Sequence, residues 1–89
     1  MWIFGRMGFL SVVEHRDDPG KLVIRARFQE DIKELCLRIR TLEGGQDVAW
    51  AEAPEGDYRY STTCARETMA RLVEQLVREI DYTNFKLPA

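Results

Sequence analysis

The chain has 89 residues, of which 45% are hydrophobic and 31% charged, and its net charge is −2. This length and composition predict one folded domain, residues 1–89, and exclude a disordered chain. The balance of 13 basic and 15 acidic residues lacks the basic excess of most duplex-DNA-binding proteins. A nucleic-acid site would therefore have to be a local patch.

The cysteine content and the apolar start of the chain indicate where the protein resides. Cys36 and Cys64 are too few for a disulfide framework, so we expect reduced thiols in a cytoplasmic protein. The apolar start at residues 1–4 is broken by Gly5 and Arg6. It is too short for a signal peptide or a membrane span, and we expect no membrane partner.

The first elements in chain order are a short strand at residues 2–4 and a hairpin around residues 17–20. Asp17-Asp18-Pro19-Gly20 is typical of a turn, and a four-residue loop would place Arg16 opposite Lys21. One face of the hairpin is then almost entirely apolar and is predicted to face the core: Phe9, Ser11, Val13, His15, Leu22, Ile24, Ala26 and Phe28. The other face carries the basic side chains among aliphatic ones and one glutamate: Arg16, Lys21, Arg25, Arg27, Leu10, Val12, Val23 and Glu14.

A helix, two strands and a second helix complete the chain. The first helix spans about residues 30–41, because its apolar positions recur with helical spacing at Ile32, Leu35, Cys36 and Ile39. Strands are expected at residues 47–52 and 57–63, with a turn at 53–56.

The second helix spans about residues 65–80. Its apolar stripe is Met69, Leu72, Val73, Leu76 and Ile80. Cys64 or Thr63 is the expected cap, with Glu67 completing a capping box. The order of elements predicts an α+β fold in which a small antiparallel sheet has two helices packed on one face, in a ferredoxin-like arrangement.

Several segments together resemble a family of small bacterial and phage proteins for which no activity is established. The resemblance spans nearly the whole chain and rests on MWIF at 1–4, GF at 8–9, SVV at 11–13, HRDDP at 15–19, RAR at 25–27, DYRY at 57–60 and IDYTNFK at 80–86. It implies a phage or mobile-element accessory protein and no particular chemistry. That setting, with the small size, suggests a modulator or inhibitor of a host complex such as a CRISPR defence system.

Catalytic and cofactor sites are weakly supported. A small enzyme could use His15, the one histidine, or Cys64, whose pKa would be lowered at a helix N-terminus. The sequence offers no full set of catalytic roles, and His15 also fits an ordinary hairpin residue bonded to the region of Asp17 or Asp18. The cysteines lack zinc-site spacing and the glycines fit no nucleotide-binding motif, so we expect no metal and no cofactor.

The basic face of the hairpin is the favoured candidate for a binding site. Arg16, Lys21, Arg25 and Arg27 would lie there, joined by Arg59 if its strand lies alongside, whereas Tyr58 and Tyr60 would point to the opposite face. Three interpretations stay open: a protein interface, a site for RNA or another single-stranded nucleic acid, and a solvated face in which arginine stems cover apolar neighbours.

The C-terminal segment has two interpretations. Tyr82 and Phe85, with Trp2, could close the core, or Tyr82, Asn84 and Lys86 could form a peptide gripped by a partner. The sequence as a whole favours a non-enzymatic protein–protein interaction module over an RNA-binding protein and over an enzyme.

Overall fold

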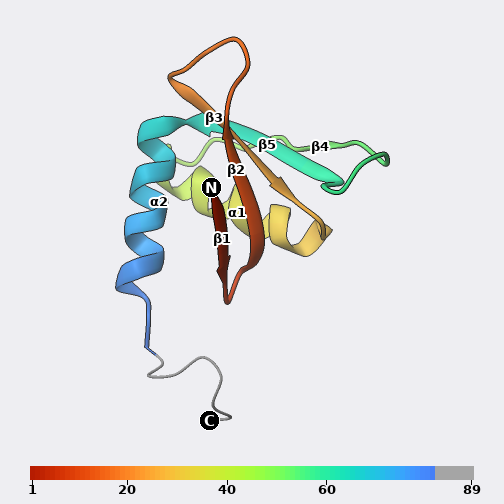
Figure 1. Ribbon diagram of the computed structural model, residues 1–89. Helices are drawn as coiled ribbons and strands as arrows, with labels where there is room; N and C mark the ends of the chain where they lie inside the picture. The colour runs from red at the N-terminus through yellow and green to blue at the C-terminus, as the bar shows by residue number, and fades with distance from the viewer. Residues whose placement is uncertain (82–89) are drawn as a thin grey trace, which may run out of the picture.

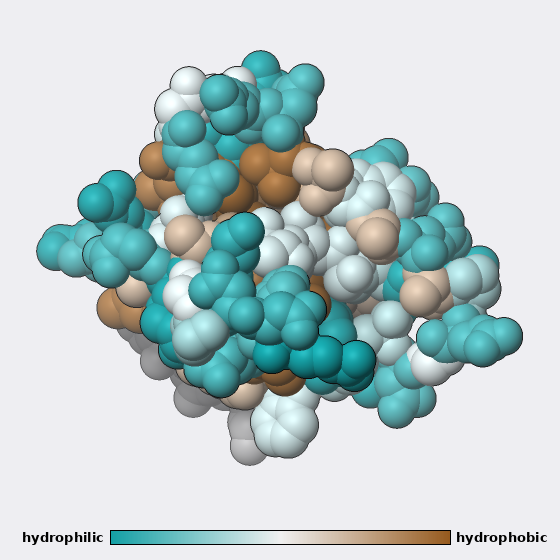
Figure 2. Space-filling model, turned by 90° about the horizontal axis from the view of Figure 1, so that it is seen from above, coloured by the Kyte–Doolittle hydropathy of each residue, from teal (hydrophilic) through white to brown (hydrophobic). Residues whose placement is uncertain are grey.

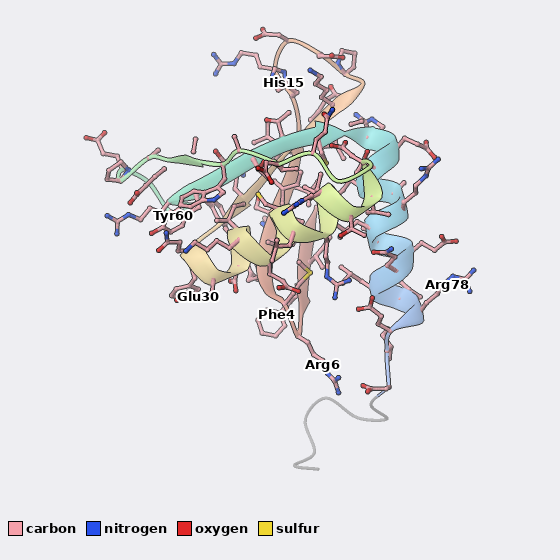
Figure 3. The ribbon with its side chains drawn as sticks, turned by 180° about the vertical axis from the view of Figure 1, so that it is seen from behind. Phe4, Arg6, His15, Glu30, Tyr60 and Arg78 are labelled. Carbon is pink, nitrogen blue, oxygen red and sulfur yellow. The ribbon has the colours of Figure 1, made fainter. Side chains whose placement is uncertain are left out.

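The computed structural model describes residues 1–81, so the predicted partner-binding residues Tyr82, Asn84 and Lys86 lie outside the described residues. Its elements are β1 (Trp2–Gly5), β2 (Gly8–Glu14), β3 (Lys21–Ala26), α1 (Gln29–Leu42), β4 (Ala51–Glu52), β5 (Tyr60–Ala65) and α2 (Arg66–Arg78). The strands form one antiparallel sheet in the order β1-β2-β3-β5-β4 (Figure 1). Both helices pack on the same face of that sheet, and α1 crosses it (Figure 3).

The α+β architecture is confirmed, but the ferredoxin-like arrangement is wrong. A ferredoxin-like chain alternates its elements as βαββαβ. Here three strands precede α1, and the chain returns after α1 to pair β5 with β3 in the middle of the sheet. The sheet therefore consists of a three-stranded meander to which β5 and the short β4 are added at one edge.

The core lies between the sheet and the helices. Its buried members come from every layer: Leu10, Val12, Ile24, Ala26 and Cys64 from the strands, Ile32, Leu35, Cys36 and Ile39 from α1, and Met69 and Leu72 from α2. The predicted stripe of α1 is thus confirmed in full. In α2, Val73 and Leu76 are half-buried, and Ile80 is exposed because it lies beyond the end of the helix at Arg78.

The predicted register of the hairpin is wrong by one residue. The His15 N–H donates to the Lys21 carbonyl at 3.1 Å, so the loop contains five residues, 16–20, instead of four. A shift of one residue turns every side chain of a strand to the other face. Leu10 and Val12 therefore lie in the core, opposite Ala26 and Ile24.

Three further expectations on the core face are also wrong. Phe9, Ser11 and Val13 point away from the helices, because they alternate with the buried residues of β2. His15 follows the last residue of β2 and pairs with Lys21, which belongs to the opposite face. Phe28 is 64% exposed, because it precedes α1 as its N-cap residue after β3 has ended.

The N-terminus of α2 is fixed by a backbone contact and by Arg66. The N-cap residue is Ala65 and makes no side-chain hydrogen bond, so the predicted caps Cys64 and Thr63 are wrong and belong to β5. The Arg66 N–H donates to the Gly20 carbonyl at 2.9 Å. The Arg66 guanidinium donates to the Pro19 carbonyl and to the Glu14 carboxylate, which ties α2 to the β2–β3 loop.

Candidate interaction surface

One face of the sheet packs on the helices, and we call the other the open face. Residues that pair directly across strands share a face of the sheet. The strand pairing therefore identifies the residues of the open face. They form three rows across the sheet: Phe4 with Phe9; Trp2 with Ser11, Arg25 and Ser61; and Val13 with Val23 and Thr63. Lys21 has the same alternation, and Arg27 follows directly after β3.

Aromatic rings and guanidinium groups form a row across the open face, in which two adjacent rings are followed by an alternation of the two kinds. The rings of Phe4 and Phe9 are 6.1 Å apart, edge to face. The Arg27 guanidinium lies 5.7 Å from the Phe9 ring and 5.6 Å from the Tyr58 ring, and Arg25 lies 4.7 Å from the Tyr58 ring. All three are within the range of cation–π attraction. We call these five residues the aromatic–arginine row; it runs from β1 over β2 and β3 to the segment before β5.

Hydrogen bonding holds one end of the row in place. The Nη2 of Arg25 donates to the Ser11 hydroxyl at 2.8 Å, while its Nε is buried and has no hydrogen-bond partner. Ser11 is only 1% exposed although it belongs to the open face. The Arg25 guanidinium is therefore held between the Ser11 hydroxyl, to which it donates, and the Tyr58 ring.

The other end of the row is strongly exposed. Trp2 and Phe4 are 70% and 67% exposed, although they are among the largest apolar side chains of the protein. They stand two residues apart on β1 and hence on the same face. Large apolar side chains that are exposed next to each other commonly mark a site at which a protein binds another molecule.

The charges on the open face are of one sign. Lys21 and Arg25 lie on it within β3, and Arg27 follows. The strand residues that face the open side include no aspartate or glutamate. The nearby strand carboxylates of Glu14 and Glu52 are bound to Arg66 and Arg59. The open face is thus locally basic in a chain whose net charge is negative.

The structure brings together some of the residues singled out from the sequence and separates others. Lys21, Arg25 and Arg27 lie on the open face as expected. Arg16 lies in the exposed β2–β3 loop, at an end of the molecule where hydrophilic residues predominate (Figure 2). Arg59 forms an ion pair with Glu52 at 3.0 Å and is not part of the row.

Sequence reasoning misplaced one tyrosine and missed three aromatic residues. Tyr60 packs on the core side, near α1 (Figure 3), as expected, but Tyr58 belongs to the open face, because it precedes β5 and stacks on the arginines. Trp2, Phe4 and Phe9 were not predicted to join the arginines. The sequence does contain a signal for this placement. Gly5 and Gly8 flank a two-residue turn, and a β-hairpin with this turn pairs Phe4 with Phe9.

The two candidate catalytic residues, His15 and Cys64, lie in different environments. His15 Nδ1 accepts a hydrogen bond from the Asp17 N–H at 3.1 Å, as an ordinary hairpin residue would. Cys64 lies buried in β5, and this burial raises its pKa to about 11, so the expected lowering is wrong. Burial also raises the pKa of the Cys36 thiol. Among residues 1–81, no three histidine, cysteine or acidic side chains lie close enough together to hold a metal ion.

A second surface feature is an apolar groove of about 420 Å³ between the β1–β2 hairpin and the end of α2. Its walls are mainly Ile3, Met7, Val73, Leu76, Val77 and Ile80. Two ion pairs lie near its rim: Arg6 with Asp81 at 2.6 Å, and Arg38 with Glu79 at 2.8 Å. Figure 3 shows Arg6 extending from the hairpin tip towards the chain that follows α2. The lining residues within 1–81 include no nucleophile paired with a base.

Comparison with family models, curated proteins and solved structures finds no match to this chain. Within residues 1–81, neither helix is both long and apolar enough to cross a membrane.

Proposed function

We propose that the chain is a non-enzymatic interaction module that binds another macromolecule through its open face. The observation that carries the proposal is the exposure of Trp2 and Phe4 beside a row of stacked arginines. A merely solvated sheet face would be expected to carry polar side chains at such positions. Aromatic residues and arginine are the types enriched in binding surfaces and in their energetic hot spots.

The positive charge of the open face indicates that the partner is not a second copy of this chain. Two copies meeting face to face would bring Arg25 and Arg27 of one against the same residues of the other. The strand residues of the face supply no carboxylate to neutralise them, and like charges brought together across an interface cost several kcal/mol. The partner therefore brings its own carboxylates or phosphates.

The resemblance to bacterial and phage proteins supports a setting for this module. On this proposal the partner belongs to a host complex, such as a CRISPR defence system, whose activity the module modulates or inhibits. A complex of that kind contains both protein and RNA, so either could supply the negative groups. This setting rests on the resemblance alone, whereas the binding surface rests on the contacts described above.

The test compares the open face with an equally altered surface elsewhere. The variant Trp2→Ser with Arg27→Glu changes one exposed apolar residue and one exposed arginine of the open face. Its matched control, Leu37→Ser with Arg71→Glu, makes the same two types of change on the exposed sides of α1 and α2. Both variants should remain folded, because exposed substitutions typically change stability by about 0.5 kcal/mol or less.

The measurement is cross-linked capture from a bacterial lysate, in which both proteins and nucleic acids are identified. We expect a set of molecules that wild type and control retain and that the open-face variant loses. Identical sets for all three proteins would overturn the proposal, because the open face would then make no contribution to binding.

A further inference from the structure

We propose, resting on the interaction module above, that the partner is a single-stranded nucleic acid whose bases stack on the aromatic–arginine row. The flat groups of the row are spaced 4.7 to 6.1 Å apart across the sheet. Unpaired bases stack on aromatic rings and on guanidinium planes, which is how sheet surfaces bind single strands. Trp2, on the same face of β1 as Phe4, offers a further ring beside the row.

The charge of the face supports the same ligand. Lys21, Arg25 and Arg27 provide positive groups along β3, and no acidic side chain belongs to the strand positions of the face. A backbone with a phosphate at every nucleotide is attracted to such a surface whatever its sequence. The negative net charge of the chain does not oppose this, because the basic groups are concentrated on one side.

The layout of the face favours a nucleic acid over an acidic protein. The fully buried core of a protein interface is mostly apolar, although aromatic residues and arginine are enriched in it. Here Arg27 stands between the rings of Phe9 and Tyr58, and Arg25 covers the sheet beside Tyr58. Leu10 and Val12 are in the core, and the aliphatic pair of the open face, Val13 and Val23, lies nearer the β2–β3 loop than the row does. Bases suit the alternation, because each stacks on either kind of plane.

A single strand fits the face better than a duplex. Duplex DNA is read by a helix or a two-stranded ribbon that enters a groove, and the bases of a duplex are already stacked on each other. Both helices of this protein lie on the other side of the sheet (Figure 3). The open face thus offers a platform for bases that are unpaired.

The probes are fluorescein-labelled 12-mers of U, A, C and dT, and binding is measured by fluorescence anisotropy at 50 mM and 200 mM salt. We expect wild type to bind at least one of them, more weakly at the higher salt. A U·A duplex of the same length should not compete. Trp2→Ala and Phe9→Ala should each weaken binding by about ten-fold, the size expected for the loss of one stacked base.

Two substitutions of Arg27 distinguish the contribution of stacking to the binding affinity from the contribution of charge. Arg27→Lys keeps the charge and loses the plane, so affinity should fall while the salt dependence stays the same. Arg27→Gln should lower the slope of log affinity against log salt by about one. In a Trp50→Phe background, the fluorescence of Trp2 should be quenched by the unlabelled probe. The Leu37→Ser, Arg71→Glu control should bind like wild type.

The outcomes distinguish this inference from the function on which it rests. Binding of a 12-mer that is unaffected by the Trp2, Phe9 and Arg27 substitutions would overturn the inference. If no 12-mer binds while the lysate experiment shows a protein lost only from the open-face variant, the partner is a protein, and the inference fails alone. If neither experiment depends on the open face, both proposals fail.

Discussion

At the scale of single residues, Gly8 lies where the β1–β2 hairpin contacts Asp31 of α1. It has a φ of 107°, which side chains rarely allow, and a Cβ there would overlap the Asp31 carboxylate. That carboxylate accepts a hydrogen bond from the Phe9 backbone, so it cannot move aside without losing the bond. Burial is the largest influence on Asp31 and raises its pKa.

We therefore predict that Gly8→Ala lowers the free energy of unfolding by more than Gly56→Ala does. Gly56 has a similar φ of 103°, but nothing lies within 4 Å of its Cβ position. Backbone strain alone should cost about 1 kcal/mol at Gly56, and the overlap with Asp31 should raise the loss at Gly8 to about 2 kcal/mol or more. Urea denaturation measures both. Equal losses would mean that the contact with Asp31 is unimportant.

The environment of Cys64 shows how an error in one helix boundary changes the chemistry predicted for a residue. The chemistry expected of Cys64 depended on its being at a helix N-terminus. The helix begins two residues later, at Arg66, and Cys64 is instead a buried residue of β5. Helix boundaries are the least certain part of any prediction from one sequence. Consequently the expected direction of its pKa shift was wrong, although the helix itself was predicted correctly.

At the scale of elements, α1 and α2 are joined by an ion pair as well as by the core. Both terminal nitrogens of Arg38 donate to the carboxylate of Glu79, the C-cap residue of α2, at 3.0 and 2.8 Å. This bidentate bond lowers the pKa of Glu79 below its ordinary value of 4.5. The Glu74–Arg78 pair, by contrast, lies within α2, at 3.5 Å, and is more exposed.

The Arg38–Glu79 ion pair makes the free energy of unfolding depend on pH in the acidic range, and this dependence can be measured. Since Glu79 has a lower pKa in the folded state, its contribution is complete above pH 4.5 and disappears as the pH falls through the lowered value. The difference in stability between wild type and Glu79→Gln should therefore shrink on acidification. Asp31 acts in the opposite direction but is common to both proteins and cancels.

Glu74→Gln is the matched control for this experiment. It removes a carboxylate of the same helix from an exposed i,i+4 pair, which typically contributes only a few tenths of a kcal/mol. Thermal melts between pH 3 and 7 should show a smaller change for Glu74→Gln than for Glu79→Gln. A pH-independent difference for Glu79→Gln would contradict the role given to Arg38.

The elements differ in how well their sequences define them. The helices were predicted because each has a single apolar stripe, so only one orientation buries it. β2 is different, because Phe9 and Val13 on one face and Leu10 and Val12 on the other are all apolar. The pattern therefore did not say which face is the core, and a loop longer by one residue was enough to reverse the prediction. The strand β3, with Lys21 and Arg25 on one side only, was oriented correctly.

At the scale of the whole molecule, stability depends on one core on one side of one sheet. Leu72 of α2 is completely buried in that core, whereas Val77 of the same helix is 61% exposed. Leu72→Asp should abolish cooperative unfolding, because burying an unpaired carboxylate costs several kcal/mol in a domain with only about 5 kcal/mol to lose. Val77→Asp should stay within about 1 kcal/mol of wild type. Circular dichroism during heating compares the two.

The overall topology could be predicted only in part. Class and layering follow from amphipathic patterns, which are local in the sequence. The pairing of β3 with β5 joins segments on either side of α1, and no local pattern encodes it. The same limit applies to the open face. Its arginines were predicted from a single hairpin, but Tyr58 reaches them only through the β3–β5 pairing, and Trp2 and Phe4 only through the β1–β2 pairing.

The strands at the two edges of the sheet are its shortest, β1 with four residues and β4 with two. Edge strands expose backbone groups that can pair with another molecule, and long flat edges act as templates for aggregation. Here the longer strands β2, β3 and β5 lie inside, and Pro54 follows β4 closely. Concentrated protein should therefore resist fibril formation through its edges. On the function proposed above, a partner would instead bind to the side chains of the open face, Trp2 among them.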